Sequence, residues 1–354
     1  MTNIIWEKIV EREGDFLKNQ LLYESYAENF QLVYGRNHSD FLTIRKRRVF
    51  THFLHKKNGK EFSQFLKEKI TKNPQFMNEM SEKGKLHFRN LIAFSEKVNK
   101  KELNKMQNKE LKNLIIKYFK LYKSPYPYFN ITLFAEELEE KKEIIRTMAD
   151  LRLLGRSSFN KTHKLIKPLF EEVGRKFGLS AEEVNCLKPK EILSLLNGNR
   201  LDIKKIMRDR QHCYFMFHEG NFVLKENEVY VIEEELAREP SKEPTNILKG
   251  RGTFQSLYKG KVKIIKTRKD IEKMDYGDVM VSRMITPDLM IECIKKAGAI
   301  ITDEGGLTCH AAVLSRELNI PALIGTGNAT KLLKDGDLIE FDTYKGQAKK
   351  VKFD

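Results

Sequence analysis

The sequence predicts a chain of two parts, a mainly α-helical N-terminal region over residues 1–235 and a C-terminal α/β unit over residues 250–354. Three observations predict this division. Before residue 235 the apolar residues recur mostly at helical spacing. Residues 236–249 hold two prolines and little apolar content, which is typical of a linker. After residue 249, short β-rich runs punctuated by glycine alternate with helical patterns, which indicates a compact α/β or swivelling β/β/α unit.

The composition is that of a folded protein. The 354 residues are 40% hydrophobic, enough to build cores. We find no signal peptide and no membrane span in the sequence. The cysteines are scattered, without a CxxC pair or metal-ligand spacing, and we interpret them as free thiols in a reducing cytoplasm. They are Cys186, Cys213, Cys293 and Cys309.

The net charge of +16 comes mainly from the N-terminal region. Such an excess could attract nucleic acid, an acidic partner or a phosphorylated substrate. A nucleic-acid reading module is not recognisable, and aromatic residues are not interleaved with the basic ones on a strand face, which disfavours nucleic acid. The densest basic stretch, IRKRRVFTHFLHKKNGK at residues 44–60, is interpreted as a solvated helix face with its connecting loop.

The helical region contains several local signals. Phe134, Leu138, Ile145 and Met148 fall on one face of an amphipathic helix. The prolines of residues 121–130, LYKSPYPYFN, interrupt the helical pattern and predict a boundary between two helical groups.

Two further helices are predicted from their ends. Ser180 and Glu183 form a capping-box signature, and Pro189 and Gly198 bracket the next helix. Residues 221–235, NFVLKENEVYVIEEE, alternate around Glu226 and Asn227, which predicts a hairpin.

One polar cluster in this region has two interpretations. Arg208, Asp209, Arg210 and His212 could face a substrate, or they could form the solvated side of a helix. No metal site is predicted. His52 and His55 are three residues apart and could share a helix face, but no third ligand has suitable spacing.

The C-terminal unit is predicted as strands interleaved with helices. The predicted strands lie at residues 260–266, 277–284, 297–303, 320–326 and 337–343, and the predicted helices at about 287–296 and 309–318.

The stretch TDEGGLTCHAAVLSREL suggests a phosphate-handling site. Gly305 and Gly306 leave no side chain between backbone N–H groups and an incoming anion. Thr308 is a plausible N-cap, which places His310 in the first turn of a helix that Asn319 could close in the left-handed conformation. The helix N-terminus disfavours a protonated imidazole and favours a bound phosphate. A structural histidine at a helix start is the other interpretation of His310.

The wider pattern resembles a known family. TDEGGLTCHAAVLSRELNIPALIGTGNATKLLKDGD is similar to the swivelling phosphohistidine domain of the phosphoenolpyruvate-utilising enzymes, which include phosphoenolpyruvate synthase, pyruvate phosphate dikinase and rifampin phosphotransferase. The similarity covers roughly the last 105 residues. Its further positions are Thr286, Pro287, Asp288, Pro321, Gly325, Thr326, Gly327, Asp335 and Gly336.

The resemblance implies that His310 carries a phosphoryl group. The residues expected to bind or support the phosphate are Gly305, Gly306, Thr308, Cys309 and Arg316. Thr308 also matches a threonine that is a regulatory phosphorylation site in some dikinases. For Arg316, a phosphate contact and a surface salt bridge with Glu317 or Asp303 are both open.

The partner domains of that family are not recognisable in this sequence. We find neither the Gly-rich phosphate loop of an ATP-grasp domain nor the strand-helix alternation of a pyruvate-binding barrel. Residues 149–196 are similar in pattern to the helical acceptor-binding domain of rifampin phosphotransferase. The resemblance therefore implies a phosphotransferase component that is incomplete on its own, with ATP and Mg²⁺ supplied through an ATP-grasp protein in trans and a small-molecule acceptor.

A second hypothesis belongs to another class of protein. The chain would be a noncatalytic regulatory or binding protein that retains the swivelling domain, while the basic helical region docks an acidic partner or nucleic acid. Under that hypothesis, binding depends steeply on salt and is indifferent to replacement of His310.

Overall fold

The computed structural model describes residues 6–37, 40–131, 133–134, 142–237, 247–253, 256–285, 296–305 and 309–351. The chain divides into two compact units. Unit 1 contains residues 1–137 and 150–239, and unit 2 contains residues 138–149 and 240–354. The predicted linker at residues 236–249 stays a prediction, because residues 238–246 lie outside the described part.

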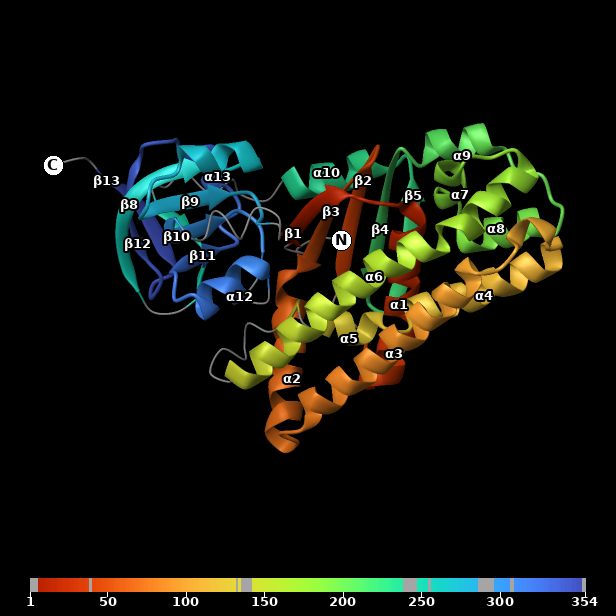
Figure 1. Ribbon diagram of the computed structural model, residues 1–354, viewed down its shortest axis with the longest axis horizontal. Helices are drawn as coiled ribbons and strands as arrows, with labels where there is room; N and C mark the ends of the chain where they lie inside the picture. The colour runs from red at the N-terminus through yellow and green to blue at the C-terminus, as the bar shows by residue number, and fades with distance from the viewer. Residues whose placement is uncertain are drawn as a thin grey trace. The chain divides into compact units, whose positions relative to one another are not determined.

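Unit 1 is rich in helices, which confirms the predicted helical character of the N-terminal region (Figure 1). The helices are α1 (Phe16–Tyr34), α2 (Lys56–Lys72), α3 (Phe76–Asn99), α4 (Asn108–Lys123), α5 (Tyr126–Asn130), α6 (Lys142–Phe177), α7 (Ala181–Asn185), α8 (Pro189–Leu196), α9 (Ile203–Asp209) and α10 (Val229–Ala237). The first residues of α6, 142–149, are counted in unit 2. The capping box at Ser180 and the helix that begins at Pro189 are both confirmed. The prolines after α4 mark the predicted interruption.

Unit 1 also contains a five-stranded antiparallel sheet that the sequence analysis did not predict. Its order is β1-β3-β2-β4-β5. The strands are β1 (Trp6–Glu13), β2 (Phe41–Lys46), β3 (Val49–His55), β4 (His212–His218) and β5 (Asn221–Glu226). One face of the sheet packs against Val229 and Ile232 of α10. On the other face, α1 places Phe16 and Tyr23 against Phe215.

Coverage of both faces explains why these strands were missed. Five successive residues of β2 and five of β4 are buried, so the alternation of polar and apolar residues that marks a strand is absent. The interpretation of residues 44–60 as a solvated helix face was wrong, because they form the end of β2, all of β3 and the start of α2. His52 and His55 therefore lie on a strand.

The predicted hairpin at residues 221–235 was also wrong. The turn lies at Glu219 and Gly220, between β4 and β5, with φ values of 50° and 82° that suit a tight two-residue turn. The second half of the predicted hairpin is helix α10, whose buried Val229 and Ile232 are three residues apart.

The polar cluster at residues 208–212 is divided between two elements. Arg208 and Asp209 end α9, while His212 begins β4 and is exposed. Arg210 is buried, with 1% of its surface exposed, and bonds Glu191 and Glu226. Its guanidinium also lies 4.6 Å from the ring centroid of Phe16. Arg210 is thus a buried structural group and does not line a solvated face.

Unit 2 contains an eight-stranded mixed sheet of order β6-β13-β12-β8-β9-β10-β11-β7. Its strands are β6 (Ile247–Lys249), β7 (Arg251–Gly252), β8 (Leu257–Ile264), β9 (Asp278–Ser282), β10 (Ala297–Thr302), β11 (Ala322–Ile324), β12 (Leu338–Asp342) and β13 (Gln347–Val351). The helices are α12 (His310–Glu317) and the short α13 (Ala329–Leu332). All five predicted strands are therefore present, and the helix predicted at 309–318 is α12. The helix predicted at 287–296 lies almost wholly outside the described residues.

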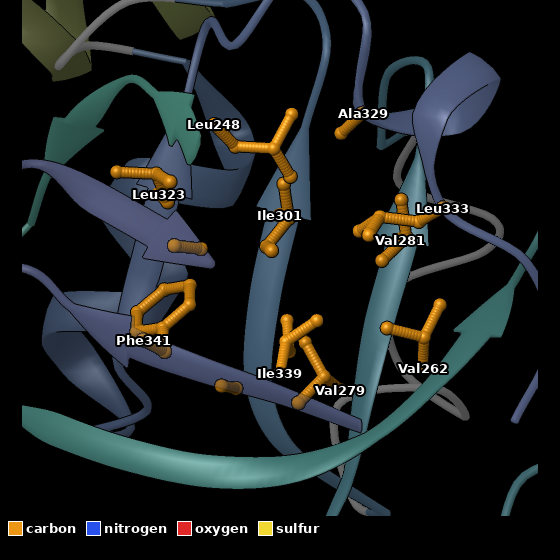
Figure 2. Packing of buried hydrophobic residues seen from close by; sticks show 12 residues of the cluster. Leu248, Val262, Val279, Val281, Ile301, Leu323, Ala329, Leu333, Ile339 and Phe341 are labelled. Carbon is orange, nitrogen blue, oxygen red and sulfur yellow. The ribbon is translucent and has the colours of Figure 1, made fainter. Parts of the chain in front are cut away.

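Two cores give unit 2 a layered structure. In the first, Phe341 of β12 faces Ile301 of β10 and Leu323 of β11, so the two halves of the sheet pack on each other (Figure 2). In the second, Ile300 and Ile324 pack with Ala311 and Ala312 of α12. The two packed parts of the sheet and helix α12 on the outer side agree with the predicted β/β/α unit.

The two edge strands of this sheet come from adjacent stretches of chain. β6 pairs with β13 and β7 pairs with β11, yet only Gly250 separates β6 from β7. A side chain at Gly250 would lie 2.8 Å from Leu323 Cγ and 3.0 Å from Ile324 O. The short segment of residues 247–252 therefore provides both edge strands of the eight-stranded sheet.

No helix in the described part of the chain combines the length and the apolar character needed to cross a membrane.

Candidate active site

Three loops meet at the carboxyl ends of the parallel strands β9, β10 and β11. β10 pairs in parallel with both β9 and β11, so the loops that follow these strands lie at one edge of the sheet. Backbone hydrogen bonds join them. Glu304 N donates to Arg283 O at 2.9 Å, and Thr326 N donates to Thr302 O at 2.9 Å. This edge is the usual ligand-binding edge of parallel sheets.

Gly305 has a backbone conformation that favours glycine. Its φ is +126°, where side chains are strained. A Cβ atom there would also lie 2.9 Å from Cys309 Sγ and 3.0 Å from Ile324 Cγ2. The loop after β10 therefore folds tightly against the start of α12 because residue 305 has no side chain. Gly306 and Thr308 lie outside the described residues.

Helix α12 begins at His310 and is capped by Cys309. Cys309 has an extended backbone, and its Sγ accepts a hydrogen bond from Ala312 N at 3.4 Å. The prediction that Thr308 is the N-cap was therefore wrong by one residue, because the thiol at position 309 takes the role expected of the hydroxyl. The position of His310 in the first turn is confirmed. The positive end of the helix dipole lies at this residue.

The inner face of α12 is fixed to the sheet. Ser315 Oγ lies 2.5 Å from Thr253 Oγ1, and Thr253 Oγ1 accepts a hydrogen bond from Ala322 N at 3.2 Å. Arg316 Nε donates to Thr253 O at 3.3 Å. The arginine thus contributes a bond to the backbone beside β11. Its expected phosphate contact stays a prediction.

Asp303 organises the site, and the sequence analysis had considered it only as a partner for Arg316. Its carboxylate accepts hydrogen bonds from Thr326 Oγ1 at 3.3 Å, from Thr330 N at 3.1 Å and from Thr330 Oγ1. Its carbonyl accepts a bond from Gly327 N at 2.9 Å. The residue is 8% exposed. Asp303 therefore ties the loop before α12 to the loop after β11, and its place directly after a buried strand was the available signal.

A charged pair lies beside this network. Arg283 Nε is 3.5 Å from Glu304 Oε1. The glutamate side chain is 9% exposed and the arginine side chain 56% exposed. This ion pair joins the loop after β9 to the loop after β10 at the edge where α12 begins.

The other motif positions have structural roles where they are described. Asn319 adopts the expected left-handed conformation with φ of 54°. Asp335 Oδ1 accepts a hydrogen bond from Ile264 N at 2.6 Å. Thr286, Pro287 and Asp288 lie outside the described residues.

This arrangement agrees with the comparison with known families. Residues 274–346 match the family described as "PEP-utilising enzyme, mobile domain". The C-terminal part of the chain is therefore similar to a PEP-utilising mobile domain. The matched residues begin just before β9 and end in the turn between β12 and β13. They include the three loops that follow β9, β10 and β11.

Several curated relatives are phosphoenolpyruvate synthases or probable phosphoenolpyruvate synthases. The chain is 50% identical over 114 residues to a probable phosphoenolpyruvate synthase of Archaeoglobus fulgidus, covering 32% of this chain and 15% of that protein. It is 37% identical over 168 residues to the probable enzyme of Methanothermobacter thermautotrophicus, covering 45% and 24%. A Pseudomonas aeruginosa phosphoenolpyruvate synthase is 36% identical over 173 residues, covering 48% and 21%. The chain therefore spans a quarter or less of the length of these relatives.

Proposed function

We propose that this chain is a phosphotransferase component in which His310 carries a phosphoryl group. The observation that carries the proposal is the position of His310. It opens α12 at the edge where three loops converge, within residues that match a PEP-utilising mobile domain. The phosphoenolpyruvate synthase relatives support phosphoryl transfer as the chemistry of this part of the chain.

The proposed carriage has two steps. An imidazole nitrogen of His310 attacks the phosphorus of a donor, an N–P bond forms, and the bond from phosphorus to the departing oxygen breaks. In the second step an acceptor oxygen attacks the same phosphorus and the N–P bond breaks, which returns its electron pair to the imidazole. Gly305, Gly306, Thr308, Cys309 and Arg316 would shape or bind the phosphoryl group. The helix dipole favours the dianionic phosphoryl group over an imidazolium.

The donor is proposed to be ATP with Mg²⁺, bound by an ATP-grasp protein in trans. The acceptor is proposed to be a small molecule held by unit 1, with phosphate, pyruvate and a small hydroxylated compound as the classes to test. The chain spans a quarter or less of the length of these relatives, so the donor and the acceptor are both part of the proposal.

A labelling experiment tests the proposal. The protein is incubated with phosphoryl-labelled ATP, Mg²⁺ and a candidate ATP-grasp protein. We expect label that is lost in acid and stable in alkali, as for a phosphohistidine, on the wild type and not on His310→Ala. His212→Gln is the matched control, because His212 is exposed on β4 of unit 1 and should accept label normally at His310. Label that persists in His310→Ala overturns the assignment.

A further inference from the structure

One residue outside the matched segment uses all of its polar atoms on α12 and the start of β11. Thr253 lies directly after β7 and upstream of the matched residues 274–346. Its N–H donates to Ala322 O at 3.1 Å, and its Oγ1 accepts a hydrogen bond from Ala322 N at 3.2 Å. Its carbonyl accepts a bond from Arg316 Nε at 3.3 Å, and its Oγ1 lies 2.5 Å from Ser315 Oγ. Thr253 therefore joins α12 to β11.

The two hydroxyl groups of this contact are buried. Ser315 is 0% exposed and Thr253 is 8% exposed. A buried hydroxyl group that loses its partner is costly, so the pair resists separation. A hydrogen bond is also directional, and it holds its two groups at a narrow range of distances and angles. The Thr253–Ser315 bond therefore favours one setting of α12 against the sheet.

The apolar contacts of α12 do not define that setting by themselves. Among the described residues of the helix, the buried apolar ones are Ala311 and Ala312. Methyl groups give the helix surface little relief, and hydrophobic attraction has no preferred direction. The helix has only eight residues, too few to be stable alone, so it depends on tertiary contacts. The bonds to Thr253 supply the directional part of those contacts.

The bond at Ser315 acts on the whole helix. Ser315 lies in the second turn, five residues after His310. Ile320 N donates to Ser315 O at 2.9 Å, which closes the C-terminal end of the helix. Because two hydrogen-bonded turns move as one body, a bond that holds Ser315 also holds the backbone of His310 at the other end.

Thr253 itself has a firm support. β7 pairs with β11, and a side chain at Gly252 would collide with Thr343 O in the turn between β12 and β13. Gly250 N donates to Gly346 O in the same turn at 2.9 Å. The segment that ends at Thr253 is therefore held by β11 and by this turn, so Thr253 provides a fixed point for α12.

We propose that Thr253 and Ser315 are positioning residues for phosphoryl transfer to and from His310. This inference rests on the proposed function. The hydroxyl pair acts through α12 and keeps the backbone of His310 at the edge where the loops after β9, β10 and β11 meet. Accurate placement of the reacting groups is a large source of catalytic rate. A segment upstream of the matched residues thus completes the site.

Removing the hydroxyl groups in the full chain tests the proposal. Ser315→Ala and Thr253→Val each remove one hydroxyl group, whereas Thr253→Ser keeps it. Alanine is a better helix former than serine, so Ser315→Ala does not weaken α12 through helix propensity. Tyr258→Phe is the matched control. It removes a hydroxyl group that donates to Gly277 O at 2.6 Å, and Tyr258 packs against the core on the other side of the sheet from α12.

Hydrogen exchange measures the hold on α12 without any phosphoryl donor. The backbone amides of α12 and of β12 are compared by mass spectrometry. In Ser315→Ala and Thr253→Val we expect about tenfold faster exchange in α12, the effect of losing one hydrogen bond, and unchanged exchange in β12. Thr253→Ser and Tyr258→Phe should protect α12 as the wild type does.

The kinetics of loading measure the effect on the reaction. Label uptake by His310 from ATP is followed at increasing concentrations of the candidate ATP-grasp protein. In Ser315→Ala and Thr253→Val we expect the maximal rate to fall about 10- to 100-fold, the effect of misplacing a reacting group, at an unchanged half-saturating concentration. Thr253→Ser should restore most of the rate. A merely structural role would lower the amount of folded protein and leave the rate per folded molecule unchanged.

Each other outcome overturns a defined claim. Equal loading by Ser315→Ala and the wild type overturns the positioning role. An equal loss of rate in Tyr258→Phe attributes the loss to general destabilisation and overturns that role as well. If Thr253→Ser is as slow as Thr253→Val, the hydroxyl group is not the cause. Unchanged exchange of α12 in every variant overturns the hold on the helix, whether or not His310 loads. A wild type that never loads overturns the proposed function, and the exchange measurement still decides the hold on α12.

Discussion

Replacing Gly305 by alanine tests whether the tight loop before α12 is required for the site. The substitution adds one methyl group at a position with φ of +126°. A matched control exists in the neighbouring loop. Gly327 also has a positive φ, +79°, but a Cβ atom there would meet nothing within 4 Å. Gly327→Ala therefore reports backbone strain alone, whereas Gly305→Ala adds a collision.

The structure sets the expected magnitude. Backbone strain at Gly305→Ala costs about 1–3 kcal/mol. The new Cβ would lie 2.9 Å from Cys309 Sγ and 3.0 Å from Ile324 Cγ2, and overpacking of this kind costs about 1–3 kcal/mol more. The control should cost about 1–2 kcal/mol. We expect Gly305→Ala to be less stable than Gly327→Ala by about 2 kcal/mol, or roughly 8 °C in the midpoint of the unfolding transition of unit 2.

Thermal unfolding followed by circular dichroism measures the difference, and the labelling experiment measures its effect on the site. Because Cys309 must shift to admit the methyl group and caps the helix at His310, the rate of label uptake should fall more in Gly305→Ala than in the control. Equal stability and equal labelling of the two variants would refute the argument that residue 305 must lack a side chain.

Three further predictions concern named contacts. Asp303→Ala removes the acceptor for Thr330 and should lower both the stability of unit 2, by about 1–3 kcal/mol, and the rate of labelling; unchanged labelling would contradict a role in ordering the loops. Arg210→Met leaves Glu191 without its bidentate partner and should destabilise unit 1 by about 3 kcal/mol in urea unfolding, with labelling of His310 unaffected. Burial lowers the pKa of His87 in the folded protein below its value in the unfolded chain. The contribution of neutral His87 to stability is therefore complete above the unfolded pKa and is lost as pH falls through the folded pKa, so Tm should fall less steeply with decreasing pH in His87→Gln than in the wild type. An equal slope in the two proteins would exclude His87 as a cause of the acid destabilisation.

The predictability of the two units differs for a physical reason. In unit 2, strands such as β9 and β10 are short apolar runs bounded by glycine or aspartate, so their limits were visible in the sequence. In unit 1, β2 and β4 are buried on both faces and contain no alternation. Basic residues between β2 and β3 added a misleading signal, because Arg47 and Arg48 form the turn of a hairpin. Tertiary packing therefore concealed this sheet from a pattern-based analysis.

The candidate site was partly predictable for a related reason. The positive φ of Gly305 and the start of α12 at His310 depend on neighbouring residues only, so they could be predicted from the local sequence. The links from Asp303 to Thr326 and Thr330 join residues more than twenty positions apart. Likewise, Thr253 and Ser315 are 62 positions apart, and the pairing of β7 with β11 places Thr253 beside α12.

The position of β6 and β7 has a consequence for synthesis of the protein. These strands leave the ribosome first among the strands of unit 2, but their partners β13 and β11 are made much later. The segment Ile247–Gly252 must therefore wait unpaired until nearly the whole of unit 2 has emerged, and both sheet edges are covered only at the end. A fragment that begins at residue 250 would lack β6 and the buried Leu248, which would leave β13 as an open edge prone to pairing with other chains. An expression fragment of the C-terminal sheet should accordingly begin upstream of Ile247.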